Sequence, residues 1–396
     1  MPHIVFNKNT PIKTPTSQDG VFFNFIAASF NFNKAHRKIE YKVGVTNENK
    51  DFLLTLKEKD DNIMIKADKV TRVTPVNIVK DALNAYVKAA NANVLFSNTN
   101  NIHHKLEPQK EYLKDIEYFV NDFDTKKEIQ IEIGFGSGRH LIHQATQNPD
   151  VQFIGLEIHT PSIEQMLKHV KIQNITNILA VNYDARLFME FIKSNSVSKI
   201  FVHFPVPWDK KPHRRVYSSE FINEALRILK INGTLELRTD SRKYFDYCTS
   251  LLTHLPTGRI TIDINKDLQV SSKYEDRWKK QGKNIYDVVL QCQHEDEEIT
   301  VNKDFSFEKS VDFSHIKTSI STNSIVEDGF VLHVEDIFEI NENSGLIKLT
   351  FGSFNKPVSK YIVINEGKVS YFQGNPIPTS ANLKAHHKLK EILCHD

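Results

Sequence analysis

The sequence is poor in cysteine and has no long apolar run, and each absence restricts what the protein can be. Its three cysteines, Cys248, Cys292 and Cys394, are odd in number and far apart. They support neither a disulfide framework nor a cysteine-based zinc site, so a reducing compartment is expected. The longest apolar stretch, VFFNFIAASF at 21–30, is too short to span a bilayer and contains Asn24.

A targeting signal and an excess of charge are also missing. The first residues, MPHIVFNKNTPIK, lack a signal peptide's order of cationic, apolar and small residues, so we expect a cytoplasmic protein. The formal net charge is only +2, which means that any binding of a polyanion must depend on a local basic patch. The histidine pairs at 103–104 and 386–387 lack a set of metal partners, and no metal is expected.

Three regions follow one another along the chain, whose 396 residues are enough for two or three domains. Residues 1–105 show strand-like alternation and then a helical pattern, which predicts an accessory region rich in β-structure. Residues 106–300 alternate apolar strands with amphipathic helices. Residues 301–396 return to short strand-like runs and end in a basic helical pattern, so we expect a second accessory region there.

The central region has the pattern of an α/β domain. Its predicted strands are IQIEIGF (129–135), VQFIGLEI (151–158), NILAVN (177–182), KIFVHF (199–204) and TLELRT (234–239). Because the strands are almost continuously apolar and helices separate them, we expect a mostly parallel sheet that is covered on both faces. Thr160 and Pro161 suit an N-cap and a first helical position, and Asn232-Gly233 is expected to end a helix at 219–230.

A glycine-rich turn, EIGFGSG at 132–138, connects the first of these strands to a helix. Gly134, Gly136 and Gly138 allow a tight turn and close approach of a ligand, at the strand end where such sheets bind ligands. The spacing is GxGxG, and Arg139 stands where the dinucleotide fingerprint GxGxxG has its third glycine. Taken alone, the turn could equally be a structural connection.

Acidic residues near the ends of three strands favour one cofactor. Glu132 lies just before the glycines, Glu157 ends the second strand and Asp184 follows the third. A ligand with an amino group, a ribose diol and an adenine amine suits three carboxylates, whereas a pyrophosphate does not. We therefore predict that S-adenosylmethionine is the cofactor. Its predicted binding residues are Glu132, Gly134, Gly136, Gly138, Glu157 and Asp184.

The order of motifs in the central region resembles that of the bacterial tRNA (guanine-N7-)-methyltransferase family. EIGFGSG is followed by GLEIH, NYDA, HFPVPWDKKPHRR, LRTDSRKYFDY and SKYE, and the basic segment is similar to the family's FPDPWxKKRHxKRR. The resemblance covers residues 125–292. It implies a Rossmann-like class I S-adenosylmethionine-dependent methyltransferase with a mostly parallel seven-stranded sheet. The implied reaction is methylation of N7 of a guanine in tRNA, in the variable loop.

The resemblance also assigns roles to single residues. Lys210 matches a substrate-binding lysine of the family, and Asp240 matches the acid of its TD pair. Ser272, Lys273 and Glu275 match its TKFE segment. These five residues are therefore expected to contact the substrate.

One position, Val206, departs from the family, which has an aspartate there. Methylation at N7 needs no general base, because that nitrogen carries a free lone pair, but negative charge near the purine stabilises the developing cation. We expect Asp209, Asp240 or Glu275 to act as the catalytic acid that replaces the missing aspartate. For Asp209, simple pairing with neighbouring cations is an equal alternative.

A basic segment follows the fourth predicted strand. Prolines stiffen this segment, so it loses less entropy on docking, and its cations would contact the phosphates of RNA. Trp208 offers a face for stacking a base, although packing beneath the loop is an equal alternative. The residues predicted to bind the substrate are Trp208, Lys210, Lys211, Arg214, Arg215, Asp240, Ser272, Lys273 and Glu275.

The sequence does not decide the role of the two flanking regions, and it leaves two alternative functions. The flanks either pack together and grip tRNA, or serve a structural or oligomerisation role; the sequence does not give the oligomeric state. The alternatives to tRNA methylation are an RNA-binding protein with an impaired methyltransferase fold and a methyltransferase of a non-RNA substrate. No interaction with a membrane is expected.

Overall fold

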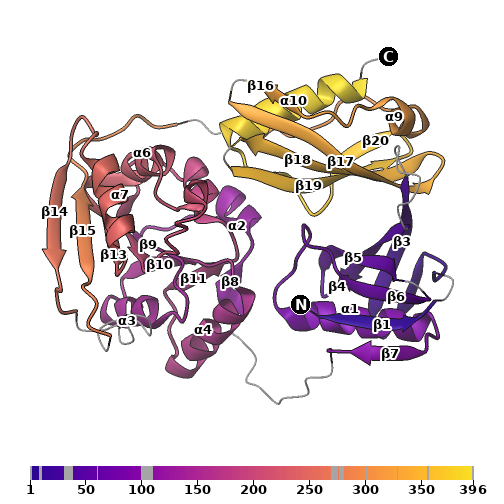
Figure 1. The fold of residues 1–396 in the computed structure, drawn as a ribbon, viewed down its shortest axis with the longest axis horizontal. Coiled ribbons are helices and arrows are strands. Elements are labelled where there is room, and N and C mark those ends of the chain that lie inside the picture. The colour runs from indigo at the N-terminus through magenta and orange to yellow at the C-terminus, as the bar shows by residue number, and fades with distance from the viewer. Residues whose placement is uncertain are drawn as a thin grey trace. The chain divides into compact units, whose positions relative to one another are not determined.

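Two compact units make up the chain (Figure 1). The computed structural model describes residues 2–8, 11–30, 39–59, 61–99, 110–268, 275, 281–299, 302–327, 329–354 and 356–394. One unit contains residues 105–301, and the other combines residues 1–104 with residues 302–396. No helix in the described ranges is both long and apolar enough to cross a membrane.

The central unit, residues 105–301, is built on one sheet. Its described residues contribute eight strands in the order β14-β15-β13-β12-β9-β10-β11-β8. The strands are β8 (Leu113–Lys114), β9 (Glu128–Ile133), β10 (Val151–Leu156), β11 (Ile178–Val181), β12 (Val197–His203), β13 (Leu229–Thr239), β14 (Arg259–Ile264) and β15 (Tyr286–Gln291). Each of the five predicted strands is present with shifted ends.

The pairing corrects the predicted sheet in strand number and in direction. Strands β8 to β13 pair in parallel, whereas β13, β15 and β14 pair antiparallel. Among the described residues the sheet has eight strands and not seven. The two-residue strand β8 is too short to leave a pattern in the sequence.

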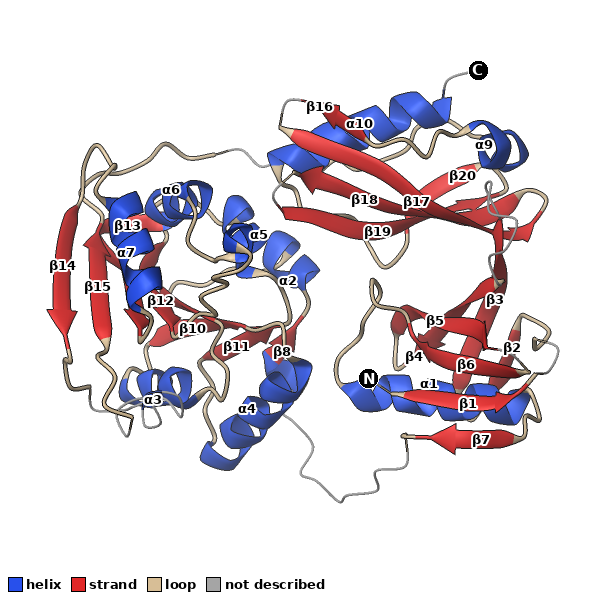
Figure 2. Cartoon of the chain, viewed as in Figure 1, coloured by secondary structure: helices blue, strands red, loops and turns tan. Residues whose placement is uncertain are grey.

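Helices connect the strands of this sheet (Figure 2). They are α2 (Ile116–Asn121), α3 (Arg139–Gln147), α4 (Thr160–Gln173), α5 (Ala185–Phe188), α6 (Ser219–Ile228) and α7 (Arg242–Leu252), with short 3-10 helices η1 (Lys110–Tyr112), η2 (Met189–Phe191) and η3 (Pro212–Arg214). Two predicted ends are wrong. The N-cap of α4 is His159, so Thr160 already belongs to the helix. Helix α6 ends at Ile228, and β13 runs on through Asn232-Gly233, where the N–H of Asn232 donates to the carbonyl oxygen of Cys292 and the N–H of Cys292 donates to that of Gly233 (2.9 Å each).

Strands from both ends of the chain form the sheet of the second unit. Its described strands are β1 (His3–Asn7), β2 (Thr16–Gln18), β3 (Val21–Phe30), β4 (Glu40–Asn47), β5 (Lys50–Lys59), β6 (Asn62–Ala67), β7 (Val94–Ser97), β16 (Ile325–Glu327), β17 (Phe330–Asn341), β18 (Ser344–Ser353), β19 (Lys356–Asn365) and β20 (Lys368–Tyr371). They follow the order β20-β19-β18-β17-β3-β4-β5-β6-β1-β7, with β2 on β3 and β16 on β17. The antiparallel pair β3–β17 joins the two ends of the chain.

The two halves of this sheet repeat one plan, namely a short hairpin, a meander of strands and a helix. Gln18 pairs with Val21 in the first hairpin, and Glu327 pairs with Phe330 in the second, so each turn contains two residues. Helix α1 (Val76–Ala89) closes the core of the first half, and α10 (Ser380–Cys394) closes the core of the second, where the short helix α9 (Phe313–Ser319) also packs.

A buried ion pair lies where the two halves meet. Lys42 on β4 is 3% exposed, and its ammonium group lies 2.7 Å from Asp68 and 2.8 Å from Glu40. From the other half, the Tyr361 hydroxyl donates to Asp68 (3.0 Å), and the Phe338 ring lies 5.2 Å from the ammonium group. Burial opposes ionisation of Asp68, but the charge and hydrogen bond of Lys42 hold the pKa of this carboxyl below its usual range.

Removing this cation should destabilise the second unit. The variant Lys42→Met leaves Asp68 buried without its cation, so we expect the free energy of unfolding to fall by about 3–5 kcal/mol, measured by urea unfolding. Combining Lys42→Met with Asp68→Asn should recover part of the loss.

Because the folded-state pKa of Asp68 is lowered, the ion pair stabilises the folded protein at neutral pH, and this contribution should disappear as the pH falls through that pKa. Unchanged stability in Lys42→Met would contradict this account.

Candidate active site

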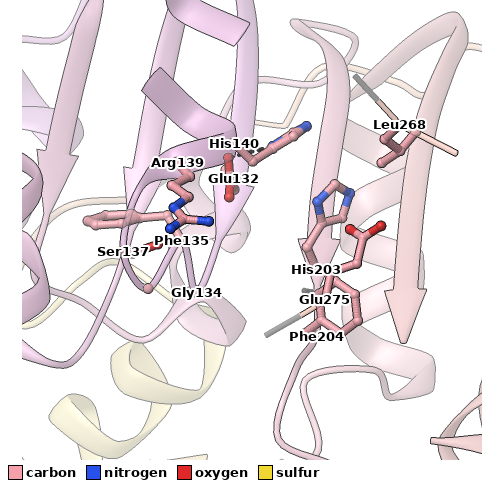
Figure 3. Close-up of a pocket in the computed structure, with 11 residues that line it drawn as sticks. Glu132, Gly134, Phe135, Ser137, Arg139, His140, His203, Phe204, Leu268 and Glu275 are labelled. Carbon is pink, nitrogen blue, oxygen red and sulfur yellow. Dashed lines mark hydrogen bonds and ion pairs between the residues drawn. The ribbon is translucent and has the colours of Figure 1, made fainter. Parts of the chain in front are cut away.

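Strand β9 is the point at which the order of strands in the central sheet reverses. From β9 the chain continues to β10 and β11 on one side, and it then returns with β12 and β13 on the other. Loops leaving β9 and β12 therefore diverge, which creates a crevice at the carboxyl ends of these strands. The pocket found there is lined by Glu132, Gly134, Phe135, Gly136, Ser137, Arg139, His140, His203, Phe204, Leu268 and Glu275 (Figure 3).

The glycine turn forms one wall of the pocket, and its glycines serve two purposes. Gly134, Gly136 and Gly138 all have positive φ angles, of 67°, 52° and 72°. A Cβ atom on Gly138 would lie 2.3 Å from Cγ of Met166, so this glycine lets α3 pack closely against α4. A Cβ on Gly134 would meet no atom within 4 Å, so its backbone faces open space that a ligand can enter.

Glu157, just after β10, holds the glycine turn in place. One of its carboxylate oxygens accepts the N–H of Gly136 (2.9 Å), and the other accepts those of Ile158 (2.8 Å) and His159 (2.9 Å). These bonds fix the carboxylate while leaving it lone pairs for a ligand. Asp184 follows the neighbouring strand β11 and is half-buried. The three predicted acids thus lie at or just after the ends of the adjacent strands β9, β10 and β11, although only Glu132 lines the pocket itself.

Two histidines accompany Glu132 inside the pocket. The carboxylate of Glu132, which is 3% exposed, lies 2.9 Å from Nδ1 of His140, and the His140 and His203 rings are 4.4 Å apart. Burial lowers the pKa of His203 well below its usual value, helped by the nearby His140. Burial also opposes the charge on His140, but the Glu132 carboxylate outweighs it and raises the pKa of His140. The pocket therefore holds a His203 that favours its neutral form beside a His140 whose charged form Glu132 stabilises.

Arg238 on β13 fixes the carboxylate on the far side of the pocket. Its side chain is 1% exposed and donates to Glu275 (2.7 and 3.2 Å) and to both oxygens of Asp287 (2.6 and 2.5 Å). Burial opposes the charge on Arg238, but these two carboxylates hold its pKa above the usual value. In Figure 3, Glu275 lies beside His203 and Phe204, across the pocket from Glu132 and His140.

The loop after β12 turns sharply at two residues. Phe204 and Trp208 have positive φ angles of 50° and 46°, which side-chain-bearing residues seldom adopt. The N–H of Phe204 donates to the carbonyl oxygen of Arg238 (2.7 Å), which anchors the start of the loop to β13. Val206 is 60% exposed and Trp208 is 37% exposed, so neither packs in the core.

Arg215 holds the far end of this loop against α7. Its Nε donates to the carbonyl oxygen of Pro207 (2.8 Å), and its guanidinium lies 4.4 Å from the Tyr247 ring and 3.5 Å from Asp209. The side chain is only 10% exposed. The structure thus places Arg215 inside the loop, whereas its neighbour Arg214 is exposed and lies 5.1 Å from the Trp208 ring.

The remaining predicted residues that the structure describes are not among those that line the pocket. Lys210 and Lys211 are exposed. Asp240 pairs with Lys283 (2.9 Å), and the N-cap of α7 is Ser241, so Asp240 does not cap that helix. Ser272 and Lys273 lie outside the described residues.

Known proteins similar to this chain cover almost its whole length. A family model described as "Putative methyltransferase" matches residues 126–288. The chain is 40% identical to the tRNA (guanine-N(7)-)-methyltransferase of Wolinella succinogenes over 99% of this chain and 100% of that protein. It is 37% identical to the protein of the same name from Campylobacter jejuni strain 81-176 (99% and 98% covered) and 36% identical to that of Helicobacter hepaticus (99% and 99% covered). The chain belongs to the tRNA (guanine-N(7)-)-methyltransferase family.

Both flanking regions of this methyltransferase therefore have counterparts in full-length relatives. The cofactor is S-adenosylmethionine, and the residues present fit it. The glycine backbone faces open space, and the carboxylates of Glu132 and Glu157 are held near it by hydrogen bonds that leave lone pairs available.

Sequence reasoning missed three residues of this methyltransferase site, namely His140, His203 and Arg238. Arg238 stands two residues before Asp240 in a strand, where an arginine normally indicates an exposed position. The sequence indicated the role of Arg238 only indirectly, because a charged residue in an otherwise buried central strand requires buried partners of opposite charge. Those partners, Glu275 and Asp287, are distant in sequence, so only the fold reveals them.

Arg238→Met should destabilise the central unit strongly. It leaves the Glu275 and Asp287 carboxylates buried without a cation, so we expect a loss of about 3–5 kcal/mol in the free energy of unfolding. Arg242→Met is the matched control, because Arg242 pairs with Asp246 at an exposed helix surface and should matter little. Chemical unfolding followed by tryptophan fluorescence measures both. Equal stability of the two variants would refute the role assigned to Arg238.

Proposed function

We propose that this methyltransferase transfers the methyl group of S-adenosylmethionine to N7 of a guanine in the variable loop of tRNA. The observation that carries the proposal is the pocket at the reversal point of the sheet, which lies between a glycine turn and a loop with exposed cations. The identity of 36–40% with tRNA (guanine-N(7)-)-methyltransferases over nearly the full chain supports it. A tRNA substrate is consistent with a cytoplasmic location and requires no membrane.

We assign the cofactor to the carboxyl ends of β9, β10 and β11. Gly134 and Gly136 admit its chain against the backbone, and Glu132, Glu157 and Asp184 accept hydrogen bonds from its amino, ribose and adenine groups. Bound there, S-adenosylmethionine supplies an electrophilic methyl group. The task left to the protein is to hold the guanine N7 in line with that methyl group, because orientation alone lowers the barrier substantially.

Negative charge near the purine is the second requirement, since the ring becomes cationic on methylation. Val206 cannot supply it. Asp209 pairs with Arg215 on the surface and Asp240 pairs with Lys283, whereas Glu275 lines the pocket. We therefore assign the main catalytic role to Glu275, held in place by Arg238, with Asp240 and Asp209 contributing charge at the rim.

The exposed part of the loop after β12 is assigned to the RNA. Lys210, Lys211 and Arg214 contact phosphates, and Trp208 provides a ring on which a base stacks. The conformation of the loop does not depend on these four side chains, because Phe204 anchors one end of the loop and Arg215 anchors the other. Ser272 and Lys273 are assigned to the substrate on the family resemblance alone.

The function is tested with labelled S-adenosylmethionine and unmodified tRNA, followed by mapping of the modified nucleoside. We expect 7-methylguanosine in the variable loop, and Glu275→Gln should lower kcat about 100-fold because it removes pocket charge. Asp209→Asn and Asp240→Asn should have smaller effects, and Val206→Ala is a neutral control.

Full activity in all three acid variants would disprove the replacement of the family aspartate. Cofactor binding without transfer would indicate an impaired RNA-binding protein instead, and transfer only to a non-RNA substrate would exclude tRNA methylation.

Arg215→Lys should act through the position of the loop. The lysine cannot reproduce the bond to Pro207 together with the stacking on Tyr247, so we expect kcat/KM for tRNA to fall about 10- to 100-fold. The affinity for S-adenosylmethionine should be unchanged, as measured by calorimetry. Arg214→Lys, which keeps a phosphate-binding charge, should remain close to wild type. An equal fall in both variants would mean that the two arginines have the same role.

A further inference from the structure

Within the described residues of the second unit, one face of the sheet is partly exposed at its β7 end. On the side of α1, residues of β6 and β1 such as Ile4, Phe6, Ile63 and Ile65 are buried in the core. The alternate residues of the same strands point to the opposite face. Nearer the middle of the sheet, that opposite face is covered, because Lys42 packs beneath Tyr361 and Phe338 from the other half.

The strand register shows which side chains share the open face. His3 pairs with Lys66 and Val5 pairs with Met64 across β1 and β6, while Val5 also pairs with Phe96 across β1 and β7. All of these residues are at least partly exposed. On the neighbouring strand β5, Lys57 pairs with Met64 and is likewise exposed. The open face therefore consists of His3, Val5, Met64, Lys66, Phe96 and Lys57.

An aromatic ring occupies one edge of this face. Phe96 is 51% exposed, and its ring centre lies 5.2 Å from that of His3 at an angle of 32°. Its neighbours on the edge strand β7, Val94 and Leu95, are also 42% and 52% exposed. Three consecutive exposed apolar side chains are unusual on a protein surface and indicate a contact site.

Positive charge gathers beside the ring. Lys57 pairs with Met64, which precedes Lys66 by two residues on the same face of β6, and burial together with the charges of Lys57 and Lys69 lowers the pKa of Lys66. The acid Glu40 on the neighbouring strand β4 is opposite Lys57 and pairs with both Lys42 and Lys57. Within the described residues, no ion pair is found for Lys66 or Lys69. Because the chain as a whole is nearly neutral, such a local cluster indicates an anionic partner.

We propose that this open face of β5, β6, β1 and β7 binds a single-stranded segment of the tRNA outside the methylated loop. An unpaired base stacks on Phe96 and His3, and the adjoining phosphates contact Lys57, Lys66 and Lys69. The pairing of an exposed ring with cations on an open sheet suits RNA, since stacking and phosphate contacts are how sheets bind unpaired nucleotides. The proposal rests on the proposed function, because it takes the substrate to be tRNA.

The test compares the affinity of full-length variants for tRNA at several salt concentrations. Phe96→Ala should weaken the Kd about 5- to 100-fold, as expected for the loss of one stacked base. Lys66→Gln and Lys69→Gln should each lower the slope of log K against log salt by about 1. KM for tRNA should rise in all three variants, while kcat and the affinity for S-adenosylmethionine stay as in the wild type.

Two control variants keep the test specific. Phe354→Ala removes a ring that is 67% exposed in a turn of the other half of the sheet, and Lys80→Gln removes a charge from α1, which covers the opposite face. Both should bind tRNA as the wild type does. If the Phe96 and lysine variants also bind as the wild type, the proposal is wrong.

Two further outcomes distinguish a failure of this binding proposal from a failure of the proposed methylation. A wild-type protein that dimerises in the ultracentrifuge, and a Phe96→Ala variant that is monomeric with unchanged tRNA affinity, would assign the face to a second copy of the chain. Failure of the wild type to methylate tRNA would overturn the proposed function. The binding measurements would still decide whether the face holds RNA, so the two failures remain distinguishable.

Discussion

Arg238 holds three residues of the central unit in place, namely Glu275, Asp287 and Phe204. Its guanidinium is buried between Glu275 and Asp287, and its carbonyl oxygen accepts the N–H of Phe204. A buried arginine is costly unless both its charge and its donors are satisfied, so its partners have little freedom to move. The carboxylate of Glu275 at the pocket and the first residue of the loop after β12 are therefore fixed relative to the same strand.

That constraint suits a reaction that depends on placement. Guanine N7 needs no base, so an enzyme that methylates it gains most from holding the methyl donor and the nucleophile in line. The rigid parts of the site serve this purpose: Glu157 ties the glycine turn to β10, and Arg215 ties the loop to α7. Under the proposed assignment, an exposed valine at position 206 is tolerable because Glu275, elsewhere in the pocket, supplies the charge.

In the second unit, the buried ion pair of Lys42 and Asp68 has a role comparable to that of Arg238 and its carboxylates. Tyr361, which is distant in sequence, donates to the same carboxylate, so strands from both ends of the chain depend on one buried charge pair. The pair also covers one part of a sheet face and leaves the β7 end open. The exposed part of that face is formed by strands of the N-terminal region, and strands of the C-terminal region cover the part next to it.

The sequence by itself determined the central strands, the glycine turn, the acids near the strand ends and the cationic loop. These features are local, because strand hydrophobicity, glycine spacing and charge runs are set by neighbouring residues. Where local signals competed with tertiary hydrogen bonds, the tertiary structure decided: Asn232-Gly233 lies within β13, where both residues share backbone hydrogen bonds with Cys292.

Only the fold could bring together residues that are distant along the chain. Arg238 and Glu275, Glu132 and His140 with His203, and Lys42 with Tyr361 meet through sheet order and register, which no short window of sequence contains. The same holds for Arg215, whose position in a cationic run resembles that of Arg214. Burial against Tyr247 separates the two, and burial is a property of packing in three dimensions.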